Sequence, residues 1–434
     1  MSAHKHISVA RPLDLERWRS LPTWLIGAGG LLALIGLLVS PTQFGYSWLL
    51  AFMFYLSICL GAMFLVLVHH LFDAGWSVPI RRFCEHLACL SSPAMAFLFL
   101  PIALLATRLY PWLGANLQAS PDHALAVKWP LFTRPMFYLI AALCFGVWWA
   151  VSSNLRKWSL RQDEDGSAAC THAMRRWSAA GIFLFAITLT LASVLWMKSL
   201  EHAWFSTMYG VYYFAASVWL TLATVYVITV LLERTGKLRG LLHEHQYYFL
   251  GTLLFAFTVF YVYIHFFQYF IIWNANVPEE TFWYKLRERG SWWNIGMILI
   301  FGHFFVPFLA LLRIDAKHFF PLMTFLCVWA WLMHFFDLAF NIMPVPHPDG
   351  FPLRWLWLDL GCLAFIGGWL LRLFVRDLSQ YRPYPVRDPR LAEALGHYHP
   401  KPRLMSGGEL GETEDFEEQL EGPIEPEQSP GGAR

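Results

Sequence analysis

One face of an apolar segment in the second half of the chain carries four polar residues at intervals of three, four and three. They are, in order, Thr258, Tyr261, His265 and Gln268. This spacing places them on one side of an α-helix, and the segment is long enough to cross a bilayer. Polar groups are costly in hydrocarbon, so we expect this face to point into a helix bundle or a wet cavity. Because the segment ends at an acidic turn with Glu279 and Glu280, the pattern is typical of a proton or quinone site.

A second group of titratable residues lies where an earlier apolar segment ends. His69 and His70 precede Asp73 by four and three residues, so we expect the carboxylate to contact one imidazole within a helical turn. A carboxylate beside an imidazole holds a proton near neutral pH. Glu85 and His86 follow at the same predicted membrane face. We interpret these five residues as the mouth of a proton-conducting path.

A third group lies within another apolar segment, where His334 precedes Asp337 by three residues. Asp337 falls deep enough in this segment that an unpaired charge would cost about 3 kcal/mol or more. It must therefore be neutral, paired or hydrated, and its candidate partners are His265, His303 and His334. We predict that these residues, together with Thr258, Tyr261 and Gln268, continue the path from the mouth toward the acidic turn.

Each group also has a purely structural interpretation. Polar residues in membrane helices often only hydrogen-bond neighbouring helices, for about 0.6 kcal/mol each. The group around Asp73 could equally bond lipid headgroups or a neighbouring subunit. In these cases the residues would matter for assembly and not for proton transfer.

Membrane-spanning helices must position these groups. Of the 434 residues, 57% are hydrophobic and 14% are charged, whereas a soluble domain carries about 25% charged residues. Ten apolar segments qualify as spans: residues 24–40, 46–72, 87–110, 133–152, 177–199, 207–232, 247–273, 292–312, 319–343 and 355–375. The sequence therefore predicts an all-α polytopic membrane protein with ten transmembrane helices.

The distribution of basic residues predicts the orientation. Of the 32 Lys and Arg residues, 24 fall in alternate loops and in the two terminal segments, which the positive-inside rule places in the cytoplasm. We predict a cytoplasmic segment over 1–23, a membrane domain over 24–377 and a cytoplasmic tail over 378–434. The tail is Pro- and Arg-rich and then acidic, so we expect it to be disordered or bound to a partner.

The order of the spans suggests an internal repeat. Spans 2–5 and 6–9 run in the same directions, and each set has a Glu-His pair before its second span, Glu85–His86 and Glu244–His245. Two parallel four-helix bundles, flanked by spans 1 and 10, would explain this pattern.

Cofactor motifs are missing from the sequence. There is no CxxCH for covalent haem and no CxxC cluster for an iron–sulfur centre or zinc. No predicted helix carries the separated pair of histidines that usually ligates haem b, and only an arrangement in which two helices contribute one histidine each would leave haem b open. We therefore expect no metal or redox cofactor in this chain, and a net charge of +2 gives no indication of nucleic-acid binding.

Two segments resemble motifs of a known family. HHLFDAGWSVPIRRFCE and QYFIIWNANVPEETFWY are similar to segments of the NrfD/PsrC-like integral membrane subunits, and most of all to the F subunit of bacterial alternative complex III. The resemblance covers about residues 10–385. It implies two four-helix bundles with two outer helices in the bacterial inner membrane, and a subunit without a redox centre of its own.

The resemblance also implies partners and a function. The expected partners are a sister NrfD-like subunit that binds quinol, periplasmic subunits with iron–sulfur clusters and haem c, and lipids. Whether a terminal oxidase is a further partner stays open. The subunit would anchor a quinol:electron-acceptor oxidoreductase and conduct protons, while quinol binding by this chain itself stays open. The alternatives are the quinol-binding anchor of a polysulfide- or nitrite-reductase-like complex and a secondary transporter.

Overall fold

The computed structural model describes residues 20–114, 123–235 and 244–395, together with residues 13, 15, 18, 238 and 242. All regular structure within these residues is helical. Ten of its helical segments are long and apolar enough to cross a membrane, which confirms the ten predicted spans. The acidic end of the predicted tail and most of the N-terminal segment lie outside the described residues.

Eight of the ten spans are formed by one α-helix each. Their bounds are α1 Ser20–Val39, α2 Pro41–Leu71, α8 Arg134–Asp165, α9 Ala168–Trp196, α10 Tyr209–Arg234, α11 Glu244–Ala275, α16 Phe320–Ile342 and α17 Leu356–Gln380, the last preceded by a 3-10 turn over Leu353–Trp355. Short helices lie between or after the spans: α7 His123–Val127, α12 Pro278–Arg287, α15 Ile314–His318 and α18 Leu391–Ala394.

The third and eighth spans are interrupted. The third consists of α3 Val78–Cys89, α4 Ala94–Leu98 and α5 Leu100–Leu104, followed by α6 Ala106–Leu109. The eighth consists of α13 Trp292–Ile298, a π-helical segment Leu299–Phe305 and α14 Val306–Leu311. Pro307 cannot donate a backbone hydrogen bond, and the helix widens before it. The Trp329 indole donates to the Gly302 carbonyl at 2.8 Å and satisfies one acceptor at this interruption.

The fourth and fifth spans are longer than predicted because they form a tight helical hairpin. α8 continues to Asp165, well beyond the predicted end at residue 152. It ends at Gly166, whose φ of 65° is the left-handed conformation typical of a helix C-terminus. Ser167 then caps α9 by accepting a hydrogen bond from the Ala169 N–H at 3.2 Å. The polar residues that extend α8 are stabilised by partners described below.

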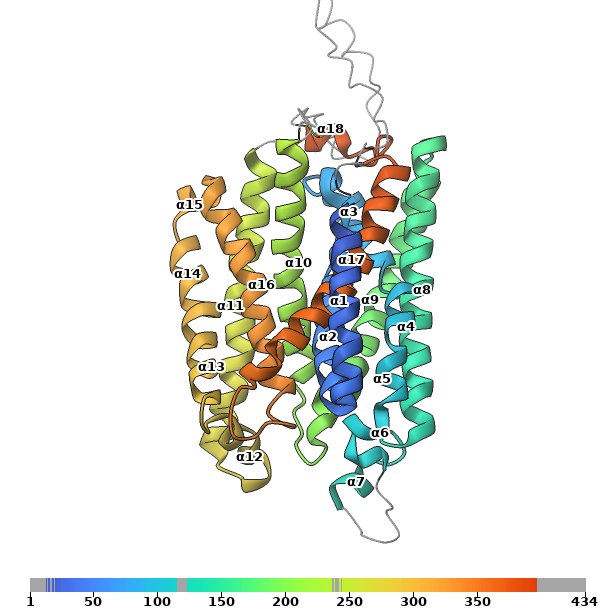
Figure 1. The fold of residues 1–434 in the computed structure, drawn as a ribbon. Helices are drawn as coiled ribbons and strands as arrows, with labels where there is room; N and C mark the ends of the chain where they lie inside the picture. Colours follow the sequence, from blue (N-terminus) through green and yellow to red (C-terminus); the bar gives the residue numbers. More distant parts are fainter. Residues whose placement is uncertain are drawn as a thin grey trace, which may run out of the picture. The chain divides into compact units, whose positions relative to one another are not determined.

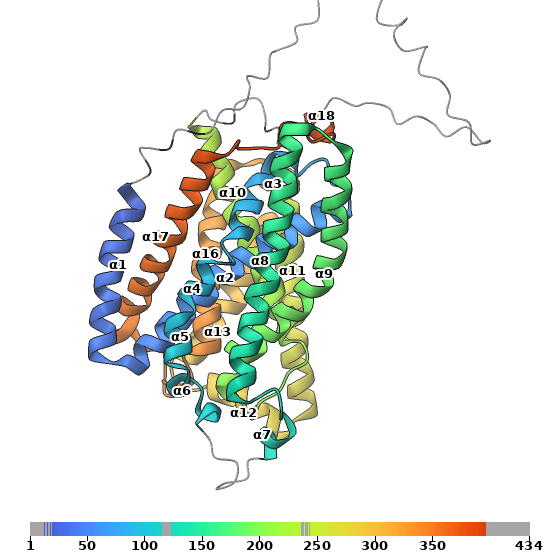
Figure 2. The same cartoon turned by 90° about the vertical axis from the view of Figure 1, so that its right-hand side faces the viewer.

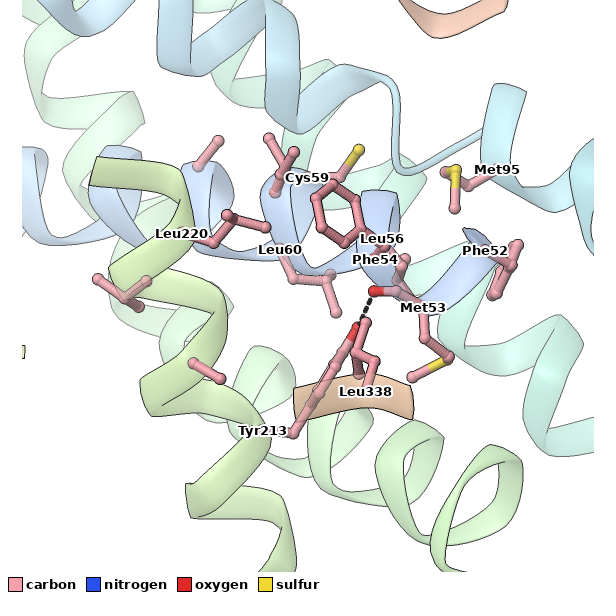
Figure 3. Packing of buried hydrophobic residues seen from close by; sticks show 14 of the residues in the cluster. Phe52, Met53, Phe54, Leu56, Cys59, Leu60, Met95, Tyr213, Leu220 and Leu338 are labelled. Atoms are coloured by element: carbon pink, nitrogen blue, oxygen red, sulfur yellow. Dashed lines mark hydrogen bonds between the residues drawn. The ribbon is translucent and has the colours of Figure 1, made fainter. Parts of the chain in front are cut away.

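The core of the membrane domain is built on α2 and α10 (Figure 1). These are the two most buried spans, and they pack directly on each other. At Gly61 a Cβ atom would lie 2.5 Å from the Ser217 carbonyl oxygen, so this close approach requires glycine. The Tyr213 hydroxyl donates to the Met53 carbonyl at 2.8 Å across the same contact (Figure 3).

The remaining spans surround this pair. α2 also contacts α3, α9, α16 and α17, while α10 also contacts α9, α11 and α16. α8 packs on α3 and α9, and α11 packs on α14. α1 lies along α17, where Gly29 meets the backbone of Phe365 (Figure 2). We call the end where α2, α8 and α17 finish the basic end, and the other, where α12 lies, the opposite end.

The chain continues across the basic end after α17. Residues 381–395, which we call the C-terminal strap, include α18, and α18 contacts α3. The Val386 N–H donates to Asp163 at 3.0 Å, and the Gln246 amide donates to the Ala394 carbonyl at 2.8 Å. The strap therefore joins α3, α8 and α11.

Candidate proton-conducting site

Asp337 on α16 is the centre of a buried polar network. The residue is 1% exposed. Its Oδ1 accepts hydrogen bonds from the Tyr261 hydroxyl at 2.8 Å and from the Tyr212 hydroxyl. Its Oδ2 has no hydrogen-bond partner, and no basic side chain of the described residues forms an ion pair with it. The carboxyl group is therefore surrounded by neutral hydroxyl donors instead of cations.

The three predicted histidine partners surround this network without hydrogen-bonding Asp337. His334 Nε2 lies 3.0 Å from the Ser57 hydroxyl. The His303 ring stacks between Trp219 and Tyr261, at centroid distances of 4.0 and 3.9 Å. Both ring nitrogens of His303 are buried and lack a protein partner within the described chain. Such atoms usually bond ordered water in a polar interior.

His265 is the third predicted partner. Its ring centroid lies 5.6 Å from that of Tyr212 and 5.8 Å from that of Tyr261. His265 and His303 therefore face the tyrosines that bond Asp337, and within the described residues no hydrogen bond or ion pair joins Asp337 to a histidine.

The network continues from Asp337 to the opposite end of the domain. The Asn341 amide donates to the Tyr212 hydroxyl at 2.8 Å, and the Tyr209 hydroxyl donates to Asn341 Oδ1 at 3.0 Å. Arg287 on α12 donates to the Asn341 carbonyl at 3.0 Å and to Glu201 at 2.8 Å. The Glu201 side chain is 12% exposed, so the network reaches the surface there.

The other residues of the predicted face have separate partners. Thr258 accepts a hydrogen bond from the Trp219 indole at 2.8 Å. Gln268 accepts from Ser206 at 2.9 Å and donates to Tyr284 at 3.2 Å. Of the four residues on this face of α11, Tyr261 alone bonds Asp337.

The acidic residues at the opposite end belong to a helix. Glu279 and Glu280 lie in the first turn of α12, where negative charge is favourable beside the helix N-terminus. No hydrogen bond within the described chain joins either residue to Asp337. The network reaches this end through Arg287 at the last turn of the same helix instead.

A second polar cluster lies at the basic end and consists of ion pairs. Arg81 Nε lies 3.0 Å from Glu85, and Arg81 also pairs with Asp388 of the strap. Arg82 lies 3.1 Å from Glu85 and 2.5 Å from Asp163 on α8. The two arginines and Glu85 are almost completely buried. The pairing compensates charges that would otherwise be costly to bury.

Asp388 lies outside the spans and is held by two arginines. Arg390 donates to it at 2.9 Å from both Nε and Nη2, in addition to the contact with Arg81. These positive charges outweigh the effect of burial and lower the pKa of Asp388 to about 2. The residue is therefore a carboxylate at neutral pH.

The predicted contact of Asp73 with a histidine is also wrong. α2 ends at Leu71, and Asp73 has a left-handed backbone with φ of 55°. Its carboxylate turns away from the helix and pairs with Arg390 at 2.9 Å and with Arg175 at 3.1 Å.

The histidines of this cluster have other neighbours. His69 lies between the Ser77 hydroxyl at 2.7 Å and Arg81 at 3.2 Å. The ring of His70 lies edge-on to His69 at a centroid distance of 4.8 Å. His86 is buried beside the ring of Tyr381, and neither of its ring nitrogens has a partner in the described chain.

The two clusters are separate. Ser57 contacts the network around Asp337, and His70 belongs to the basic end. Both lie on α2, about 20 Å apart at the usual helical rise. No chain of hydrogen bonds within the described residues joins them. The structure thus places the predicted residues in two groups and does not show one continuous path.

Sequence reasoning missed four residues of the central network: Tyr209, Tyr212, Glu201 and Arg287. Tyr209 and Tyr212 are three residues apart, and Asp337 and Asn341 are four apart. Pairing these two helical spacings could have identified α10 as a partner of α16. Arg287 and Glu201 carry no such signal, because they meet only through the fold.

Within the residues that the structure describes, no group of three or more His, Cys, Asp or Glu side chains could hold a metal ion. The sequence matches no protein-family model and no curated protein.

Proposed function

We propose that this chain is a non-redox membrane subunit that conducts protons within a quinol-oxidising respiratory complex. The observation that carries the proposal is the position of Asp337, a buried acid bonded by two tyrosines and linked to Glu201 at the opposite end. Ionisable residues inside membrane spans are rare and commonly mark ion or proton pathways.

The chemistry of the network suits proton transfer. A tyrosine hydroxyl can donate one hydrogen bond and accept another, so it can receive a proton on one side and release one on the other. Tyr212 does both here, because it donates to Asp337 and accepts from Asn341. Asp337 can gain a proton without breaking an ion pair, and its Oδ2 is buried without a hydrogen-bond partner in the described chain.

The architecture proposed for the family has support in the packing of the helices. Two sets of four spans each form a closed ring of contacts. In the first set α2 contacts α3, α3 contacts α8, α8 contacts α9, and α9 contacts α2. In the second set the same order of contacts runs through α10, α11, the eighth span and α16. We propose that these sets are two four-helix bundles, with α1 and α17 outside them. The basic end would face the cytoplasm, since basic residues are concentrated in its loops.

The redox chemistry would belong to other subunits. The proposed partners are a quinol-binding sister subunit and periplasmic subunits with iron–sulfur clusters and haem c, by resemblance to the NrfD/PsrC-like family and to the F subunit of alternative complex III. A proton conductor needs no redox centre of its own, because electron transfer in the partners can drive it.

One observation favours a second function. The third and eighth spans are interrupted within the membrane domain, and discontinuous helices are typical of secondary transporters. A transporter would conduct its substrate without redox partners.

Purification of the native protein separates the two functions. The respiratory proposal predicts that tagged chain co-purifies with subunits that contain haem c and iron–sulfur clusters, and that the chain freed of them has no haem absorbance. Purification as a monomer or homo-oligomer, without a redox partner, would contradict the proposal and favour the transporter.

A further inference from the structure

A large groove opens at the basic end of the domain, where it is lined by Tyr381, the residue whose ring lies beside His86. Its volume is about 1160 Å³, above the roughly 300–1,000 Å³ of pockets that enclose drug-sized ligands. Residues of three spans line it, from the third span, α8 and α17. The third span is interrupted between Cys89 and Ala94. This interruption lies at the wall of the groove, where a continuous helix would present a row of side chains.

One end of the groove is basic. Four basic side chains line it, Arg156, Lys157, Arg161 and Arg376. They face three carboxylates, Glu164, Asp165 and Asp377. The lining therefore has more basic than acidic side chains, and a negatively charged ligand would neutralise the excess positive charge.

The ion pairs show where the excess positive charge lies. Asp377 is shared, at 2.8 Å from Arg156 and 3.2 Å from Arg376. Arg161 pairs with Asp165 at 3.0 Å. Lys157 is exposed and forms no ion pair within the described chain. Because Arg376 shares its only acidic partner among the described residues with Arg156, its guanidinium group and the ammonium group of Lys157 are available to an anion.

The other end of the groove is apolar and aromatic. Phe97 and Trp149 are 61% and 57% exposed on the outer surface of the domain. Phe97 stacks on Trp369 at a centroid distance of 6.4 Å. Trp149 lies about 12 Å before Lys157 along α8, at the usual helical rise. The groove therefore joins a basic rim to a lipid-facing aromatic wall within the depth of one bilayer leaflet.

We propose that this groove is a binding site for an anionic phospholipid. The headgroup phosphate would contact Lys157 and Arg376, and the acyl chains would lie along Phe97 and Trp149. Basic pockets between spans on the cytoplasmic side are suited to anionic headgroups. A neutral quinol would not require the cation excess, and a free anion would not require the apolar wall. The bound lipid would support the interrupted third span against α8 and α17.

The test uses the full chain, in the assembly in which it purifies, after detergent exchange has removed lipid. Native mass spectrometry with added phosphatidylglycerol should show one tightly retained molecule, and the same amount of phosphatidylcholine should not. Each basic residue is expected to contribute about fivefold in affinity, which corresponds to about 1 kcal/mol. Lys157→Gln combined with Arg376→Gln should therefore weaken retention about 25-fold. Lys285→Gln, an exposed change at the opposite end, should not alter it.

A steric variant tests the groove itself. Ser153 lines the groove, so Ser153→Trp should block retention, whereas Ala186→Trp, at an exposed position of α9, should leave it intact. Equal retention of both lipids, or full retention by Ser153→Trp, would overturn the proposal. Recovery of a quinone from the groove in place of phospholipid would overturn it as well.

Discussion

The two buried polar clusters of this protein compensate their carboxyl groups in opposite ways. At the basic end, Glu85, Asp163 and Asp388 each pair with an arginine. In the membrane core, Asp337 accepts hydrogen bonds from two tyrosine hydroxyls and forms no ion pair within the described chain. A paired carboxylate cannot take a proton without losing its partner. The acid bonded only by hydroxyl groups can, so we infer that the first cluster holds the structure together and the second transfers protons.

The largest effect is expected from breaking an ion pair at the basic end. Arg81→Met removes one of two arginine partners from both Glu85 and Asp388, which keep Arg82 and Arg390. Loss of one partner of a buried ion pair typically costs about 3–5 kcal/mol. We expect a loss of stability of that size in the free energy of unfolding in detergent, and rapid proteolysis of the strap.

A double variant provides the control for this prediction. Arg81→Met with Asp388→Leu removes both charges, so part of the stability should return. If the double variant lost as much free energy of unfolding as the two single variants together, the Arg81–Asp388 ion pair would not be the reason for the loss.

A smaller effect on stability is expected when the pH is lowered. Asp388 faces Arg81 from α3, Arg390 from its own segment and His70 from α2. Its pKa falls from 3.8 to about 2 in the folded protein, so its stabilising contribution is present above pH 4 and is lost as the pH falls toward 2. The shift corresponds to about 2 kcal/mol. Hydrogen exchange of residues 385–392 should therefore be constant from pH 5 to 8, after correction for intrinsic rates, and should accelerate below pH 4. Release of the strap near neutral pH would contradict this assignment.

The smallest effects on stability are expected in the central network. Tyr261→Phe removes one hydrogen bond to Asp337, while Tyr212→Phe also removes the acceptor for Asn341. Hydrogen bonds in membrane proteins average about 0.6 kcal/mol, and bonds to charged groups about 1.5–3 kcal/mol. A loss near the lower value for Tyr261→Phe is expected for a neutral Asp337, and a larger loss is expected for Tyr212→Phe. A loss of about 3 kcal/mol for Tyr261→Phe would indicate a charged Asp337.

The sequence was a good guide to the spans and a partial guide to the site. Long apolar segments predict helices because the bilayer leaves few alternatives. The spacing on α11 correctly places Tyr261 on the buried face, and His334 and Asp337 are both buried on α16. The length of α8 was not predicted, because its polar end is stabilised by contacts with residues far away in the chain.

The partners of each group could not be predicted from local spacing. Asp73 was expected to contact a histidine one turn away, but its backbone turns and it meets Arg390, more than 300 residues later. Asp337 was expected to contact a histidine, but the rotation of α10 presents Tyr212 instead. Helix rotation is set by packing over the whole bundle, and a single helix carries little information about it.

The most direct test of the central claim is proton transfer by Asp337→Asn. Asparagine keeps the shape of the side chain and an acceptor for Tyr212 and Tyr261, but it cannot exchange a proton at this position. In vesicles that contain the assembled complex, we predict normal assembly and normal electron transfer from quinol, with loss of the protons transferred beyond those that quinol oxidation itself releases. Wild-type proton transfer in an assembled Asp337→Asn complex would contradict the account.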